Sequence, residues 1–149
     1  MNLLEKMKSD LITAMKEKDK ERLTVLRMVK GAIQLEVINN KKEEKEELLI
    51  DVVSKQIKMR KESISEFEKG GRNDLIEATQ KEIDILSEYL PKQLSSEEID
   101  AIIDNVFKKV NPTSPKDMGA IMKEATPLLK GKADMKEVSN KIKDRINSL

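Results

Sequence analysis

Apolar residues recur at steps of three and four along most of this sequence, the spacing that places them on one face of an α-helix. Four such runs precede residue 91, and they predict helices at residues 3–15, 20–38, 46–69 and 74–90. Gly70 and Gly71 separate the last two runs. Because paired glycines supply the positive φ that ends a helix, we expect the third and fourth helices to form an antiparallel hairpin.

The second predicted helix is apolar over much of its circumference, so we expect it to contact more than one neighbour. Gly31 lies in the middle of this helix, where a glycine costs about 1 kcal/mol relative to alanine, and it suggests a close helix crossing. In the first helix the apolar stripe ends at Met15. The stripe expected to be buried in the second helix consists of Leu23, Leu26, Met28, Val29, Ile33 and Val37.

Pro91 separates two kinds of sequence. All four prolines lie at or after this position, and the patterns that follow it are shorter than those before it. Proline has no N–H to donate and pushes the preceding residue out of the α region, so a helix arriving at Leu90 should end there. Three further helices are expected beyond it. Patterns typical of helix N-terminal caps are Asp74 with Glu77, Ser95 with Glu98, Ser114 with Pro115, and Asp134 with Glu137.

The sequence therefore predicts an all-α protein of two parts. The N-terminal part, residues 1–92, is a helical domain with a long helical hairpin, and the C-terminal part, residues 93–149, is a small three-helix domain. Tyr89, Leu90 and Pro91 form the expected domain junction. Tyr89 is the chain's one tyrosine, and we expect its ring to pack where the two parts meet.

The composition excludes several kinds of catalytic and metal-binding site. The chain has no cysteine and no histidine, so a thiol nucleophile, a cysteine or histidine metal site and the commonest general base are all excluded. Asp100 and Asp104 share a helix face and could hold magnesium, but such spacings are expected often among 28 acidic residues, which favours a solvated face. We expect no catalytic residue, no cofactor and no metal.

The N-terminal residues also bear on location. They carry charges within the first helical turn and no apolar segment typical of a secretion signal. Nowhere does the chain approach the roughly 18 consecutive apolar residues that a membrane-spanning helix needs. We therefore expect a cytoplasmic protein that does not enter membranes.

One stretch near the end of the chain has a local excess of basic over acidic residues, although the whole chain balances 29 basic residues against 28 acidic ones. Residues 123–145 hold seven basic side chains and four acidic ones, and they are the most plausible nucleic-acid footprint in the sequence. Because this stretch contains no aromatic residue, any contact would be to phosphate, shape and sugar. The candidate residues are Lys123, Lys130, Lys132, Lys136, Lys141, Lys143 and Arg145.

Two further surfaces have competing interpretations. Met118 and Met122 form a flexible apolar ridge that is typical of core filling, with an adaptable partner groove as the alternative. The third helix carries four basic residues between positions 52 and 61, and this face is more often a solubility feature than a phosphate site. The four are Lys55, Lys58, Arg60 and Lys61.

Several segments together resemble the YqeY-like family over essentially the whole chain. None is diagnostic alone, but their order and spacing are fairly specific. The segments are Arg22-Leu23-Thr24-Val25-Leu26-Arg27 with Ala32-Ile33 and Glu36, Lys58-Met59-Arg60-Lys61-Glu62-Ser63-Ile64, Gly71-Arg72-Asn73-Asp74-Leu75, Glu82-Ile83 through Leu86 to Tyr89-Leu90-Pro91, Met118-Gly119, Met122, and Gly131-Lys132-Ala133-Asp134. From about Leu94 the chain also resembles the tail domain of the B subunit of glutamine-dependent aminoacyl-tRNA amidotransferases.

This resemblance implies an all-helical, non-catalytic accessory module that binds tRNA or another structured RNA, or that joins amidotransferase or synthetase components. In the amidotransferase the tail helps to engage tRNA, while the chemistry belongs to other domains. One alternative is a protein-interaction module without nucleic-acid binding, using the methionine ridge or the second helix. Another is a carbon–nitrogen ligase with glutamine as amide donor, which the domain likeness suggests but no residue here supports.

Overall fold

The computed structural model describes residues 2–149, and in that range the protein is all-α, as the sequence predicts. Seven α-helices and one short 3-10 helix follow one another, and no strand occurs between these residues. The chain divides into two compact units, one ending at Leu90 and the other comprising Pro91–Leu149. No helix within the described range is both long and apolar enough to cross a membrane.

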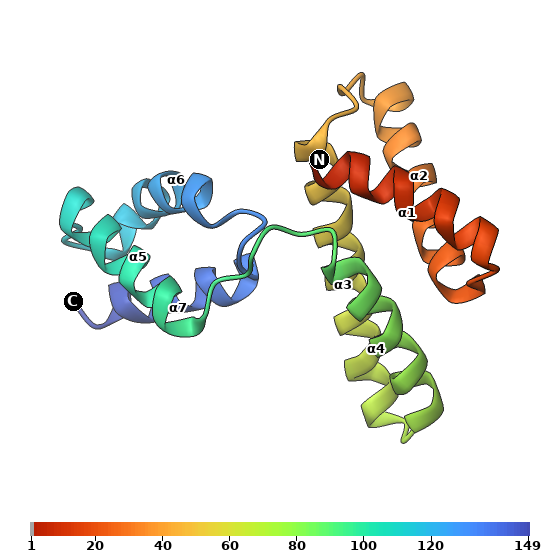
Figure 1. The fold of residues 1–149 in the computed structure, drawn as a ribbon. Helices are drawn as coiled ribbons and strands as arrows, with labels where there is room; N and C mark the ends of the chain where they lie inside the picture. The colour runs from red at the N-terminus through yellow and green to blue at the C-terminus, as the bar shows by residue number, and fades with distance from the viewer. Residues whose placement is uncertain (1) are drawn as a thin grey trace. The chain divides into compact units, whose positions relative to one another are not determined.

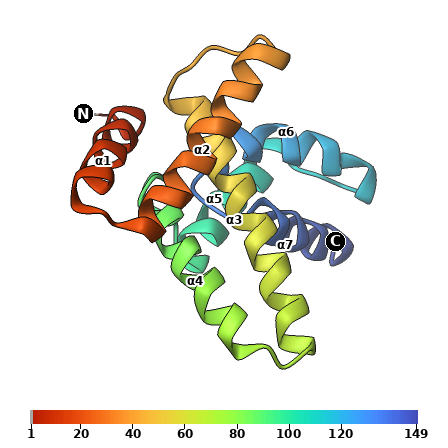
Figure 2. The ribbon, with the colours of Figure 1, turned by 90° about the vertical axis from the view of Figure 1, so that its right-hand side faces the viewer.

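The first unit contains four helices, and each lies within a few residues of its predicted position (Figure 1). The two longest, α2 and α3, run in opposite directions beside each other (Figure 2). The next pair, α3 and α4, forms the expected antiparallel hairpin, and Gly71 in the turn has the positive φ of 67° that favours glycine. The bounds are α1 Leu3–Glu17, α2 Lys20–Asn39, α3 Glu46–Lys69 and α4 Asn73–Ser87.

The helix starts of this unit agree with the sequence in one case and differ in another. Asp19 directly precedes α2 in the sequence and caps it, because its carboxylate accepts a hydrogen bond from the Arg22 backbone N–H at 3.3 Å. Asp74 does not cap α4, because α4 already begins at Asn73 and the Asp74 carboxylate pairs with the Arg72 side chain. That bond also holds the pKa of Asp74 below its usual value.

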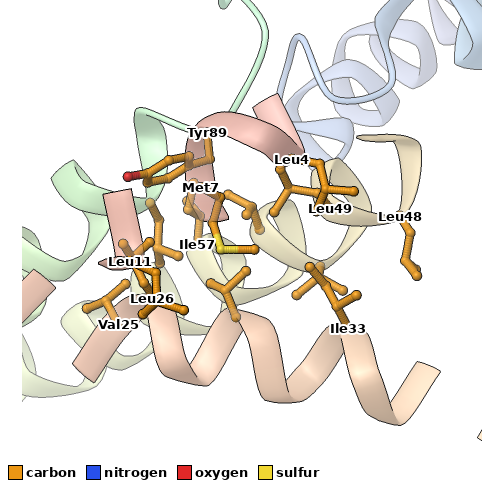
Figure 3. Close-up of a cluster of buried hydrophobic side chains, with 14 of the residues drawn as sticks. Leu4, Met7, Leu11, Val25, Leu26, Ile33, Leu48, Leu49, Ile57 and Tyr89 are labelled. Carbon is orange, nitrogen blue, oxygen red and sulfur yellow. The ribbon is translucent and has the colours of Figure 1, made fainter. Parts of the chain in front are cut away.

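The core of the first unit is aliphatic and gathers side chains from all four helices (Figure 3). Leu26 of α2, Leu49 of α3 and Leu86 of α4 are fully buried in it. Two residues that the sequence places in buried stripes are exposed instead: Met15 and Met28 keep 51% and 46% of their surface. Both lie at the margin of their stripe, where helical spacing alone does not fix burial.

Tyr89 belongs to this same core. Its ring is fully buried beside Met7 (Figure 3). Its hydroxyl donates a hydrogen bond to the Asp10 carboxylate at 2.6 Å. Arg22 donates to the hydroxyl at 3.4 Å, and the Lys6 ammonium lies 5.0 Å from the ring centre. These contacts belong to α1 and α2 of the first unit, so the ring serves that unit's own packing.

The second unit is a three-helix bundle with a separate aliphatic core. Two of its caps follow the sequence, whereas Ser114 with Pro115 opens a short 3-10 helix instead of the α-helix that begins at Met118. Ser95 and Glu98 form a reciprocal capping box at the start of α5, and Asp134 caps α7 through the Lys136 N–H. Pro127 lies inside the last turns of α6 without ending the helix before Leu129. The elements are α5 Ser96–Val110, the 3-10 helix η1 Pro115–Asp117, α6 Met118–Leu129 and α7 Met135–Asn147.

Candidate nucleic-acid interface

On the last helix, α7, buried apolar side chains and exposed polar side chains form separate stripes. Val138, Ile142 and Ile146 are buried in the core of the second unit. A second stripe, at steps of four, three and four, is exposed throughout and contains no acidic residue. We call it the outer α7 stripe; its members are Lys136, Asn140, Lys143 and Asn147. Glu137 and Asp144 lie three residues before and four residues after Asn140, so they border this stripe on one side.

Two of the basic candidates on α7 are engaged within the bundle. Lys141 donates through its Nζ to both the Ser96 hydroxyl and the Asp100 carboxylate, each at 2.8 Å. Arg145 pairs with Asp104, and its guanidinium lies 4.6 Å from the centre of the Phe107 ring. These contacts join α7 to α5, so they give Asp100 and Asp104 a structural use as ion-pair partners.

The loop between α6 and α7 holds its shape through backbone contacts. Gly131 is buried and has a φ of 79°, a conformation that favours glycine. The Leu94 N–H donates to the Lys132 carbonyl at 2.9 Å, and the Gln93 side chain donates to the Gly131 carbonyl at 2.8 Å. The loop is thus fixed to the segment that precedes α5, while the Lys132 side chain remains exposed.

Lys123 adds an exposed cation on α6. The acidic residue beside it, Glu124, accepts a hydrogen bond from Lys109 of α5 at 2.8 Å. That bond lowers the pKa of Glu124, so the carboxylate stays ionised and engaged with another lysine. Lys130, at the other end of α6, is exposed as well.

The second unit therefore offers exposed cations to an anionic ligand. The outer α7 stripe combines two ammonium groups with two amides, which can both donate to phosphate oxygens. The two asparagines were not singled out from the sequence, although their spacing from Lys136 and Lys143 was available to find them. Within residues 2–149 no cluster of three or more acidic side chains is arranged to hold a metal ion.

The methionine ridge has a packing role. Met118 and Met122 are half-buried and lie against the core of the second unit. They fill space beside residues such as Ile121, which is fully buried.

In the first unit, Arg60 of α3 is engaged in contacts within the chain. It donates to the Glu82 carboxylate at 3.0 Å and to the Gln56 side chain at 2.8 Å.

Comparison with known proteins identifies the class of this all-helical chain. Residues 4–146 match the family model described as Yqey-like protein. Because this match covers nearly the whole chain, the protein belongs to the YqeY-like family, as its sequence motifs suggest.

Several curated relatives carry the name "Altered inheritance of mitochondria protein 41, mitochondrial". The relative from Pyrenophora tritici-repentis is 31% identical over 98% of this chain and 82% of its own length. The relatives from Kluyveromyces lactis and Lachancea thermotolerans are 39% and 38% identical over 73% of this chain. In those two cases the match spans about 60% of the relative's own length.

These names correct the expected location. The sequence led us to expect a cytoplasmic protein, because its N-terminal residues show no apolar segment. The relatives are named as mitochondrial proteins, and this finding contradicts the cytoplasmic expectation. The error has a physical origin, since the lack of an apolar segment speaks only against secretion and membrane insertion and not against other compartments.

Proposed function

We propose that this protein is a non-catalytic accessory module that binds the sugar–phosphate backbone of a folded RNA such as tRNA. The observation that carries the proposal is the outer α7 stripe, in which Lys136 and Lys143 stand on one exposed helix face without an acid among them. Lys132 on the fixed loop and Lys123 on α6 extend the positive charge of the same unit. The resemblance of this unit to the amidotransferase tail supports tRNA as the ligand.

The chemistry of the unit favours backbone contacts over base recognition. Phe107 is the only aromatic residue after Pro91, and its ring is covered by the Arg145 guanidinium. Stacking on unpaired bases is therefore not available to this unit. Lysine and asparagine side chains suit phosphate and ribose oxygens, which position an RNA without reading its sequence.

The proposal is tested by titrating labelled bulk tRNA with the full chain at several salt concentrations and following fluorescence anisotropy. We expect one phosphate contact from each of Lys123, Lys132, Lys136 and Lys143. The logarithm of the association constant should then fall linearly with the logarithm of the salt concentration, with a slope of roughly −3. A DNA duplex of equal charge should bind less well, because it lacks the ribose 2′-hydroxyl groups to which the asparagines of the stripe can hydrogen-bond. Absence of salt-sensitive tRNA binding at low ionic strength would overturn the proposal.

A further inference from the structure

A second exposed surface lies on α2, in the other unit. Leu35 and Ile38 keep 60% and 73% of their surface, and Met28 keeps nearly half. Together with Gly31 these residues follow steps of three and four, so they form one apolar stripe on the outside of the helix. We call the surface of Met28, Gly31, Leu35 and Ile38 the outer α2 face. Contiguous exposed apolar surface of this kind marks interaction sites on soluble proteins.

Gly31 has no structural reason to be glycine within this chain. The sequence suggests a close helix crossing at this position, but a Cβ built on Gly31 would meet no heavy atom within 4 Å. Gly31 has ordinary helical backbone and no positive φ. A glycine in the middle of a helix is unfavourable, so its presence fits a notch where a backbone from outside approaches.

The outer α2 face borders α3. The Arg60 guanidinium donates to the Met28 sulfur at 3.7 Å, so the Arg60 side chain reaches this face. Met59, the neighbour of Arg60 in the sequence, is more than half exposed. Farther along, Lys55 of α3 is near enough to Glu36 of α2 to contribute to lowering the pKa of that carboxyl.

Positive charge lies beside this apolar surface. On α2, residues 27–38 contain Arg27 and Lys30 against Glu36 alone, and Glu36 is already bound by Asn40 and Lys42. On α3, residues 52–61 contain four basic residues and no acid. Arg60 pairs with Glu82, which leaves the other three cations of that stretch exposed.

We propose that the outer α2 face docks an amphipathic helix of another protein, whose apolar stripe is flanked by Asp and Glu residues. The apolar residues supply the contact area, and the missing side chain at Gly31 lets the partner's backbone approach. The nearby cations, among them Arg27, Lys30 and Lys55, attract the acidic flanks. A second copy of this chain fits less well because it would bring the same cations together. A lipid surface has no backbone that would use a notch.

The probe for this proposal is a synthetic helical peptide of about 20 residues, the length of a helix that spans 30 Å. It carries a Leu and Ile stripe flanked by Glu, with one Trp at the edge of the stripe. This chain contains no tryptophan, so the emission spectrum reports the peptide alone. The matched control peptide replaces each flanking Glu with Lys, and a scrambled peptide keeps the acidic composition without the stripe.

The acidic peptide should bind at least about tenfold tighter than either control peptide. Leu35→Glu should weaken its binding about tenfold, whereas Met15→Glu, an equally exposed change on α1, should not. Gly31→Gln should weaken binding while the melting temperature stays equal or rises, because a Cβ at this position meets no heavy atom within 4 Å and glutamine favours a helix more than glycine does. Equal binding of the acidic and basic peptides, or full binding by Leu35→Glu, would overturn the proposal.

Two further measurements address the other occupants. Sedimentation velocity that shows a dimer which Leu35→Glu dissociates would replace the partner helix with a second copy. Co-sedimentation with phosphatidylglycerol vesicles, lost in Leu35→Glu and without binding of the acidic peptide, would replace it with a membrane surface. The inference is independent of the RNA proposal, since each concerns a different unit and different side chains.

Discussion

At the scale of single residues, Tyr89 shows how a polar group is accommodated in an aliphatic core. Its ring is fully buried, and its hydroxyl is bonded to Asp10 and Arg22. Burial first, and then the bond to Asp10, raise the pKa of the Tyr89 hydroxyl well above its usual value. The hydroxyl therefore stays protonated and donates, and the bonds link α1, α2 and the end of α4.

Replacing Tyr89 with Phe tests this link. The change leaves the ring in place and removes the hydrogen bond to a charged carboxylate, so the free energy of unfolding should fall by about 1–2 kcal/mol. Urea denaturation followed by circular dichroism measures it. In an Asp10→Ala background, which removes the acceptor, the same change should cost less, and equal costs in both backgrounds would show that the bond carries no stability.

Tyr89→Ala should have a larger effect, because it empties a fully buried site in the core of the first unit. We expect a loss of about 3–5 kcal/mol. The sequence led us to expect that this change would mainly loosen the two parts of the chain relative to each other. Hydrogen exchange distinguishes these two roles of Tyr89. Faster exchange of the amides in α1 and α2 supports the core role, and protection equal to that of the unaltered chain contradicts it.

At the scale of elements, the helices follow from local sequence, and their faces follow only in part. Period, caps and glycines located the long helices to within a few residues, because these are short-range properties. The prediction that Met28 is buried was wrong, since its burial depends on which neighbouring helix covers the margin of α2. Local sequence does not show which helix that is.

Gly31 allows the effect of a single helix-interior glycine on the stability of α2 to be measured. Gly31→Ala should raise the free energy of unfolding by roughly 0.5–1 kcal/mol, because the added methyl group meets open space and alanine favours the helix. Thermal or urea unfolding checks the change. Gly71→Ala is the opposing control: its φ of 67° strains any side chain, so that change should destabilise. A loss of stability in Gly31→Ala would mean that the space is filled.

The capping box at the start of α5 gives a pH dependence. The Ser95 backbone and side chain lower the pKa of Glu98 below its ordinary value of 4.5. A lowered carboxyl pKa contributes stability that is present above 4.5 and is lost as the pH falls through the folded value. Glu98→Gln should therefore lower the melting temperature at pH 7 and have no effect near pH 2. Glu97→Gln is the matched control in the same turn, and a difference that persisted at pH 2 would contradict this role.

At the scale of the whole molecule, the all-α class and the presence of a small C-terminal bundle could be predicted from the sequence. The candidate site could be predicted only as a list of cations. Which of them lie exposed depends on tertiary pairing, as with Lys141 and Asp100, which are 41 residues apart and bonded at 2.8 Å. No local pattern distinguishes Lys141, which is bound to α5, from Lys143, which lies on the outer stripe.

The outer α7 stripe is the feature that most directly tests the account. We predict that Lys136→Gln with Lys143→Gln weakens tRNA binding and makes the slope against salt shallower by about 1.5, while the melting temperature is unchanged. Lys108→Gln with Lys116→Gln removes the same charge from exposed positions elsewhere in this unit and should leave the slope nearly unchanged. Anisotropy titrations of both double variants over a range of salt concentrations give the comparison. Equal slopes for the two variants would contradict a phosphate-binding role for α7.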